Sequence, residues 1–329
     1  MATASKSLSY KTLTDQIRPF DARRDMAMVA DLIEECFADT LDKDGERYIR
    51  QMRDYARNAG LINWAPIPPE WMGGPFIGYV CERDQKIVGN ISLISYRVGR
   101  KPNILLANVA VHPDYRRIGI AKKLTHQAIN HARRKNTSEI WLHVREDNQA
   151  AISLYRGLGF REITRRTTWI CQREALKFDT PPGIQIRNRS YTDWEQQKKW
   201  LVENYPPELS WHSPMKLGSL TPGWAGSLKR FFSNLFIQQW AAVQDNKLLC
   251  LVAWQSTSTF ANALWLAAPV DCDQSALRGL LNHVRRQVAF RRPLMLEYPA
   301  KIHAHTIQAA GFREHQTLIW MKTELSNSE

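Results

Sequence analysis

The chain has 329 residues, 44% of them hydrophobic and 23% charged, with a formal net charge of +13 at neutral pH. This length exceeds one typical domain, so two are expected, and the composition is that of a folded globular protein. No apolar run approaches the roughly 18 residues that a membrane-spanning helix needs, and the opening residues MATASKSLSYK lack the apolar core of a secretory signal. We therefore expect a cytoplasmic protein with no membrane partner.

The cysteines and the positive charge each exclude a class of protein. Five cysteines, at positions 36, 81, 171, 250 and 272, are scattered and form no Cys-x-x-Cys pair, which predicts buried thiols and not a disulfide framework or a metal site. Basic residues are spread over the whole chain, without interleaved aromatic and basic residues. Because such a diffuse excess is typical of a solvated surface, no specific nucleic-acid site is expected, and an acidic substrate fits the charge equally well.

The first half predicts alternating strands and helices. In chain order these are a short strand near Ile17, helices over about 25–38 and 45–58, strands near 76–82, 86–97 and 104–111, a helix over 119–133, a strand over 139–144, a short helix over 148–159 and a last strand over 160–173. RDQK at 83–86 is typical of a hairpin turn. The apolar run ILLANVAV at 104–111 suits a central strand that is covered on both faces.

The second half echoes the first. LGFREITRRTTWI at 158–170 returns as AGFREHQTLIWMK at 310–322, and IRPFDARRDMAMV at 17–29 is echoed by IRNRSYTDWEQQK at 186–198. The second copy repeats a hairpin (241–254), a strand (261–270), a helix with Leu277, Leu281, Val284 and Val288 facing inward, a strand (294–298) and a closing strand. Two prolines and a glycine in KFDTPPG, 177–183, separate the copies, so we predict two domains, 1–178 and 184–329.

The segment VHPDYRRIGIAKKL at 111–124 carries the chemical signal of the first half. A glycine that opens a helix leaves several backbone N–H groups without partners, and the helix dipole places partial positive charge there. Arg116 and Arg117 precede Gly119, and Ala121 is about the largest residue that a close approach permits. The spacing fits neither an ATP loop nor a dinucleotide loop. The segment therefore predicts an anion site, the alternative being an ordinary basic surface.

This segment resembles motif A of the GCN5-related N-acetyltransferases (GNAT), whose loop (R/Q)-x-x-G-x-(G/A) is matched here by Arg116, Gly119 and Ala121. The following stretch DNQAAISLYRGLGF resembles a second signature of that family, matched by Asn148, Ala151, Leu154, Tyr155, Gly159 and Phe160. The resemblance covers most of residues 15–175 and is nearest to the branch that acetylates protein N-terminal amines. It implies an α/β (α+β) fold: two tandem domains of this type, each a mixed, mostly antiparallel sheet flanked by helices.

The resemblance also implies the cofactor and its site. Acetyl-coenzyme A would be the acyl donor, and its pantetheine arm would pair with free backbone groups of one strand. The implied binding residues are Asn108, Val109, Ala110, Val111, Arg116, Arg117, Ile118, Gly119, Ile120, Ala121, Lys122, Asn148 and Tyr155. Asn148 is also expected to cap its helix. Tyr155 would protonate the departing thiolate; otherwise it is ordinary helix packing.

His143 departs from the pattern of that branch, where a glutamate commonly draws the proton from the amine. A neutral histidine is able to do the same work. Two other interpretations stay open: His143 merely lines the sheet, or the proton leaves directly to water. His303 and His305 are expected on a helix, where residues two apart diverge, so they predict no metal site.

The second copy lacks these features. Its counterpart of the glycine loop, VDCDQSALRGLL at 270–281, has no glycine at the helix start, and Ile307 and Ala300 stand where Tyr155 and Asn148 are expected. We expect this copy to shape the acceptor cleft or to brace the first. The loop WAPIPPEWMGG at 64–74, with Trp64 and Trp71, is expected either to line the acceptor site or to pack against the second domain.

The sequence thus predicts an acetyl-coenzyme A dependent N-acetyltransferase that acts on a primary amine in a ternary complex. A protein or peptide α-amine is the preferred acceptor and a small amine the next. The alternatives are a non-catalytic acyl-coenzyme A sensor or scaffold and, from the net charge alone, a nucleic-acid binder.

Overall fold

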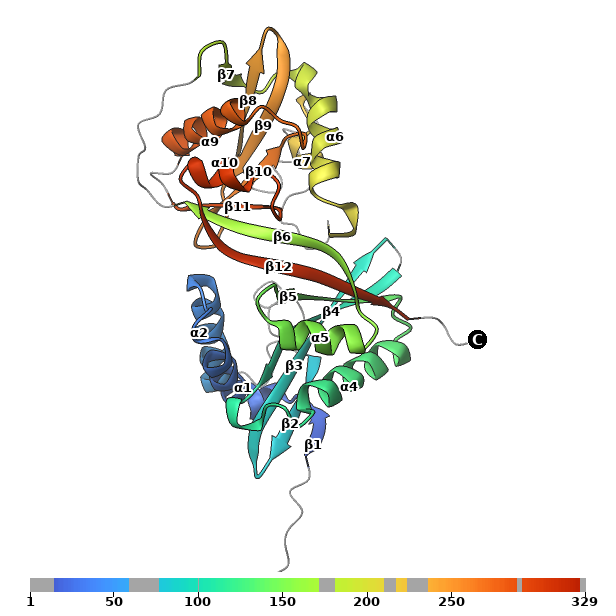
Figure 1. The fold of residues 1–329 in the computed structure, drawn as a ribbon. Coiled ribbons are helices and arrows are strands. Elements are labelled where there is room, and N and C mark those ends of the chain that lie inside the picture. Colours follow the sequence, from blue (N-terminus) through green and yellow to red (C-terminus); the bar gives the residue numbers. More distant parts are fainter. Residues whose placement is uncertain are drawn as a thin grey trace, which may run out of the picture. The chain divides into compact units, whose positions relative to one another are not determined.

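A computed structural model describes residues 15–58, 77–99, 101–171, 181–209, 217–223, 236–288 and 292–325. Their helices and strands are drawn in Figure 1 and group into two compact units. The first unit contains Met1–Leu142 with Thr323–Glu329, and the second contains His143–Lys322. Among the described residues, no helix has both the length and the apolar character needed to span a lipid bilayer.

The first unit contains a mixed sheet with the strand order β1-β2-β3-β4-β5. Its strands are β1 (Gln16–Pro19), β2 (Ile77–Arg83), β3 (Lys86–Val98), β4 (Lys101–Val111) and β5 (Glu139–Arg145). Neighbours are antiparallel except for β4 and β5, which are parallel. Asp84 and Gln85 both have positive φ and join β2 to β3, which confirms the hairpin that RDQK predicts.

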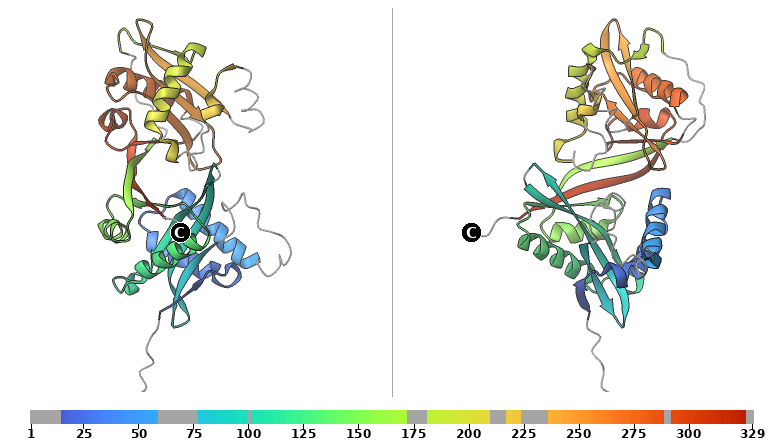
Figure 2. Two further views of the ribbon diagram at one scale, coloured as in Figure 1. Left: turned by 90° about the vertical axis from the view of Figure 1, so that its right-hand side faces the viewer. Right: turned by 180° about the vertical axis from the view of Figure 1, so that it is seen from behind.

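Helices cover both faces of this sheet (Figures 1 and 2). On one face α1 (Ala22–Phe37) packs with α2 (Lys43–Asn58) beside it, and on the other lies α4 (Ile120–Arg134). The apolar stripe of α4, from Ile120 to Ala132, is buried. α4 approaches the sheet closely because β3 has a glycine there: a Cβ atom on Gly89 would lie 2.8 Å from the side chain of Ile120.

The second unit contains a sheet with the strand order β12-β6-β11-β10-β9-β8-β7. Its strands are β6 (Arg161–Cys171), β7 (Gln185–Asn188), β8 (Ile237–Gln244), β9 (Lys247–Gln255), β10 (Asn262–Ala267), β11 (Leu294–Pro299) and β12 (Arg313–Glu324). Its helices are α5 (Gln149–Gly157), α6 (Trp194–Asn204), α7 (Leu217–Leu220), α9 (Gln274–Val288) and α10 (Ala304–Ala309). α9 and α6 pack on opposite faces (Figure 2), and the four apolar residues predicted to face inward from α9 are buried.

The closing strands of the two copies pair with each other. β6, which comes from the first half, lies antiparallel between β11 and β12, which both come from the second half. The buried hydroxyls of Thr167 and Thr317 join β6 to β12 at 2.8 Å. The second compact unit therefore includes β6 together with the strands that pair with it. The predicted domains, 1–178 and 184–329, are based on the sequence repeat instead and stay a prediction.

The repeat is visible in one matched contact. Arg18 donates two hydrogen bonds to Asp25, at 2.6 and 2.8 Å, and Arg187 donates two to Asp193, at 2.7 and 2.8 Å. Burial alone would raise the pKa of both carboxyls, but these charge-assisted hydrogen bonds hold both pKa values below the ordinary range. The motif IR, followed by an aspartate, thus builds the same strand-to-helix link twice.

Candidate active site

The start of α4 is an open turn with unusual backbone geometry. Arg117 and Gly119 both have positive φ, 67° and 88°, a region that favours glycine. Gly119 is the N-cap of α4, and no side chain caps the helix there. A Cβ atom on Gly119 would meet nothing within 4 Å. The first N–H groups of α4 therefore have no side-chain cap, and they lie at the positive end of the helix dipole.

Side chains add positive charge to this turn. Arg116, Arg117 and Lys122 are exposed, and the first turn of α4 contains no acidic residue. The next lysine, Lys123, pairs with Asp15 at 2.8 Å, so part of its charge is neutralised. The backbone donors and the arginines together favour an anion with several oxygens, such as a diphosphate.

β4 parts from β5 close to this turn. Parallel pairing joins Asn103–Leu106 of β4 to Glu139–Leu142 of β5 and includes no residue of β4 beyond Leu106, although β4 continues to Val111. The pairing of β4 with β3 shifts at the same place: Ile91 of β3 stands opposite two residues, Asn108 and Val109. This is a β-bulge, which bends a strand and redirects its peptide groups.

Two carbonyls of this segment already accept hydrogen bonds from side chains. The Asn108 carbonyl accepts from Nδ2 of Asn90 at 2.9 Å. The Val111 carbonyl accepts from Nε of Arg116 at 3.0 Å and from the thiol of Cys36 at 3.3 Å. Burial raises the pKa of the Cys36 thiol, so it stays a donor at neutral pH. We expect the backbone of residues 108–111 to pair with the donor, and two of its carbonyls are therefore already occupied.

These features fit coenzyme A. The open turn from Arg116 to Lys122 offers backbone donors and cationic side chains to the diphosphate, and the β4 segment beyond Leu106 offers peptide groups to the amides of pantetheine. The space in front of Gly119 matters most, because any side chain there would occupy it. Ile118, with 48% of its surface exposed, lies in the same turn.

The remaining predicted residues belong to the second unit. Asn148 is the N-cap of α5, and its Oδ1 accepts from the Ala151 N–H at 3.1 Å, which confirms the predicted cap. Tyr155 follows on α5 with 5% of its surface exposed, and its ring meets that of Phe160 edge to face at 5.9 Å. Burial raises the pKa of Tyr155 to about 12, so the phenol is neutral and able to donate a proton at physiological pH.

His143 lies on β5 and is exposed, whereas its neighbours Leu142 and Val144 are buried. Its ring is 5.0 Å from that of Trp320 on β12. Buried and exposed side chains therefore alternate along β5 at this position. His303 of the second copy is buried and is the N-cap of α10, with a φ of 54°. Its Nε2 donates to the Pro269 carbonyl, and its Nδ1 accepts from the side-chain amide of Gln274.

Sequence reasoning did not predict a polar cluster behind the β4 bulge. Nδ2 of Asn108 donates to the hydroxyl of Tyr48 on α2 at 3.2 Å and lies 3.4 Å from the hydroxyl of Ser92. Asn108 has a φ of 50°, a conformation that asparagine tolerates better than most residues. The signal in the sequence was the single asparagine inside the apolar run ILLANVAV.

In the second copy, a side chain caps the corresponding helix start. Asp273 precedes α9 and its Oδ1 accepts from the Ala276 N–H at 2.8 Å and from the Ser275 hydroxyl at 2.5 Å. These hydrogen bonds hold the pKa of Asp273 below its ordinary range, so a negative charge occupies the place where the first copy presents open donors. Ile307, in the place of Tyr155, is fully buried.

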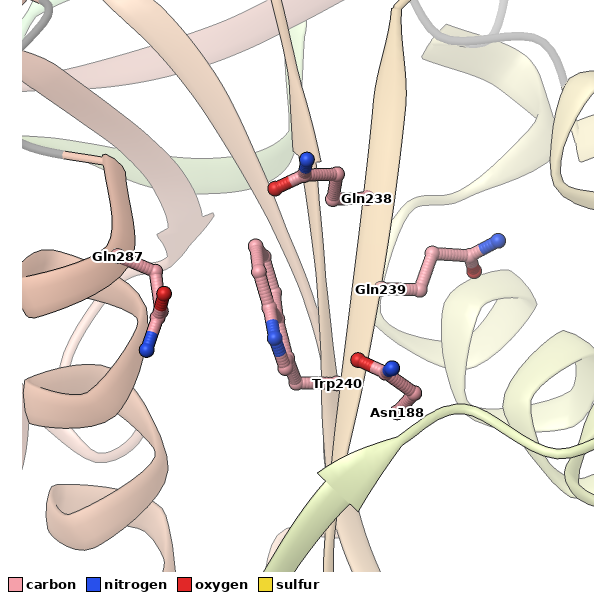
Figure 3. Close-up of a pocket in the computed structure, with 5 residues that line it drawn as sticks. All are labelled: Asn188, Gln238, Gln239, Trp240 and Gln287. Carbon is pink, nitrogen blue, oxygen red and sulfur yellow. The ribbon is translucent and has the colours of Figure 1, made fainter.

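A separate pocket of about 410 Å³ lies in the second unit, at β7, β8 and α9 (Figure 3). Asn188, Gln238, Gln239, Trp240 and Gln287 line it. None of these side chains titrates near neutral pH, so this pocket has no group for proton transfer. It is not the candidate acyl-transfer site.

Comparison with known proteins points to acetyltransferases. The profile of the acetyltransferase (GNAT) family matches residues 28–160. Ribosomal protein bS18-alanine N-acetyltransferase of Escherichia coli K12 is 42% identical over 64 residues, which are 20% of this chain and 43% of that protein. The match therefore spans less than half the length of that relative.

Two solved structures share the fold over nearly the whole chain. A GCN5-related N-acetyltransferase from Sphaerobacter thermophilus has a TM-score of 0.57 at 14% identity, with 95% of this chain and 97% of that one covered. A tandem GNAT protein from the clavulanic acid biosynthesis pathway has a TM-score of 0.51 at 17% identity, with 96% of this chain and 100% of that one covered. The family profile thus matches the part of the chain, residues 28–160, that contains the open helix start and the parted strands.

Proposed function

We propose that this protein is an acetyl-coenzyme A dependent N-acetyltransferase that transfers an acetyl group to a primary amine. The family match and the N-acetyltransferase relatives support acyl transfer to an amine. The observation that carries the proposal is the uncapped start of α4, where Gly119 has a φ of 88° and open space in front of it. The bound donor supplies an activated thioester, and the chain supplies its position and its proton donors.

The preferred acceptor is a protein or peptide α-amine, and a small amine is the next candidate. The basis is the relative that acts on the alanine of a ribosomal protein, as its name states. The loop WAPIPPEWMGG, which we expect near the acceptor, lies outside the described residues.

Each proposed residue has one task. The open turn from Arg116 to Lys122 holds the diphosphate, and the peptide groups of the β4 segment orient the donor and polarise the carbonyl that is attacked. Tyr155, a phenol that is neutral at physiological pH, donates the proton that the departing thiolate needs. His143, exposed on β5, is the candidate base that takes the proton of the amine.

The second copy has a supporting role in this proposal. Residues 1–178 would carry the transfer, and residues 184–329 would shape or brace the acceptor site. The charged cap at Asp273 and the buried Ile307 speak against a second donor site.

The test is product formation with defined acceptors. The full chain is incubated with acetyl-coenzyme A and a library of peptides that differ at the first residue, beside a panel of small amines, and acetylated products are identified by mass spectrometry. Profiling of acetylated species in cells with and without the protein extends the search to unknown acceptors. Donor-dependent acetylation of a primary amine is the expected result.

Two outcomes would overturn the proposal. Tight binding of acetyl-coenzyme A with no acetylated product in any panel would indicate a sensor or scaffold. Acetylation that persists at the wild-type rate in Gly119→Glu would place the donor elsewhere, because that variant fills the open turn with a negative side chain.

A further inference from the structure

We infer that Asn90, Asn108 and Tyr48 form a positioning network for the donor strand: they hold the bulge of β4 in the shape that presents its peptide groups to coenzyme A. All three residues lie in the first unit. The inference rests on the proposed function, since it assigns the strand beyond Leu106 to the donor.

The network begins with a buried amide. Asn90 on β3 has 2% of its surface exposed, and its Nδ2 donates to the Asn108 carbonyl at 2.9 Å. Without that donor the carbonyl would lose its hydrogen bond in a partly buried place, which costs up to about 1–3 kcal/mol. Asn90 therefore fixes the direction of the peptide group between Asn108 and Val109.

The side chain of Asn108 extends the network to a helix. Asn108 has a φ of 50°, a region that asparagine enters more readily than most residues, and its side-chain hydrogen bonds stabilise this conformation. Its Nδ2 donates to the hydroxyl of Tyr48 at 3.2 Å and lies 3.4 Å from Oγ of Ser92. Burial raises the pKa of Tyr48, so the phenol stays neutral and accepts this hydrogen bond at any physiological pH.

The bulge lies shortly after the last residue of β4 that pairs with β5, in the segment that we assign to coenzyme A. Pairing between β4 and β5 includes Leu106 and no later residue of β4, and the two bulged residues, Asn108 and Val109, follow after Ala107. A bulge aims peptide groups in a direction that a regular strand does not offer. Tyr48 ties this bent segment to α2, whose residues Ile49 and Met52 are buried in the core beside it. The three side chains thus hold the bulged segment of β4 in one conformation.

The experiment measures coenzyme A binding by calorimetry in the full chain, beside the free energy of unfolding in urea. Asn108→Gly keeps access to positive φ but removes the side chain, and we expect the dissociation constant to rise about tenfold. Tyr48→Phe removes only the hydroxyl and is expected to raise it roughly threefold. Tyr191→Phe, at a site with 74% of its surface exposed, is the matched control with no expected change.

A double-mutant cycle separates positioning from simple stability. If Tyr48 acts through Asn108, the double variant binds no more weakly than Asn108→Gly alone. Unchanged coenzyme A affinity in all variants, with only a lower free energy of unfolding, would overturn the inference, and so would losses that multiply in the double variant. Failure of the wild-type chain to bind coenzyme A is a distinct result, which would remove the proposed function and this inference with it.

Discussion

Tyr155 is the residue on which the proposed chemistry depends most. Replacing it by phenylalanine keeps the ring that packs on Phe160 and removes the proton donor. We expect Tyr155→Phe to lower turnover about 100-fold or more while the dissociation constant of coenzyme A changes less than about twofold. Steady-state kinetics and calorimetry on the same preparation measure both. Equal small effects on both would mean that Tyr155 is packing alone.

The pKa of Tyr155 also predicts the pH dependence of turnover. Because burial raises this pKa to about 12, the acid form persists well above pH 10, where an ordinary tyrosine is about half ionised. Turnover is therefore expected to show no loss from this residue between pH 7 and 10. A fall near pH 10 that disappears in Tyr155→Phe would contradict the raised pKa.

Gly119 tests the anion site at the same scale. Its φ of 88° makes any side chain unfavourable, so Gly119→Ala is expected to lower the free energy of unfolding by about 1 kcal/mol. Gly119→Glu is expected to abolish coenzyme A binding, because a carboxylate then occupies the open turn. Urea unfolding and calorimetry measure the two effects.

Gly157 on α5 provides the matched control for stability. A Cβ atom there also meets nothing within 4 Å, but φ is not positive. Gly157→Ala is expected to leave stability unchanged or to raise it by about 0.5–1 kcal/mol, because alanine favours a helix. A similar loss in both variants would show that the conformation of Gly119 has no special cost.

At the scale of elements, α4 and α9 are the corresponding helices of the two copies, but they begin differently. α4 begins with an uncapped glycine and α9 begins with the capping aspartate Asp273. Both helices keep a buried apolar face, so the packing of the repeat persists without its anion site. A cap satisfies the first N–H groups, which stabilises a helix by about 1 kcal/mol. α4 lacks this stabilising cap at the place where we propose that a ligand binds its first N–H groups.

β6 gives an element-scale prediction about truncation. Both edges of β6 pair with strands of the second half, β11 and β12, and buried Arg166 donates to Glu297 at 2.5 Å. A fragment of residues 1–178 would expose both edges of this strand, and such edges favour aggregation. We expect the fragment to be insoluble when made alone and soluble when made together with residues 184–329.

Size-exclusion chromatography and urea unfolding measure this outcome. Cooperative unfolding of a soluble 1–178 fragment would contradict it, because the strand would then have found other partners.

At the scale of the whole molecule, the two copies predict one donor site per chain. Within the described residues, both copies have a strand that continues past its parallel pairing, β4 beyond Leu106 and β10 beyond Leu264, but the helix start that follows is uncapped in the first copy and carries a charged cap in the second. Calorimetry is expected to give one coenzyme A per chain, and Gly119→Glu is expected to remove all binding. Two molecules per chain, or half of the binding left in that variant, would assign a ligand to the second copy.

Much of the fold was predictable because its local signals are strong. The helix predicted over 119–133 is α4 at Ile120–Arg134, and the strand predicted over 86–97 is β3 at Lys86–Val98. Apolar period and turn residues determine such elements locally. The loop from Arg116 to Lys122 was predictable for the same reason, since glycine and arginine act there through their own backbone and charge.

The sequence by itself determined the repeat, the elements and the residues around Gly119 and Tyr155, because each depends on neighbours along the chain. Only the tertiary structure decided that β6 pairs with β11 and β12, since alternation identifies a strand but not its partner. It also decided that Asn90, Asn108 and Tyr48 meet behind the bulge. Those three residues lie far apart in the chain, and their contact follows from a register shift and a helix packing that no local pattern contains.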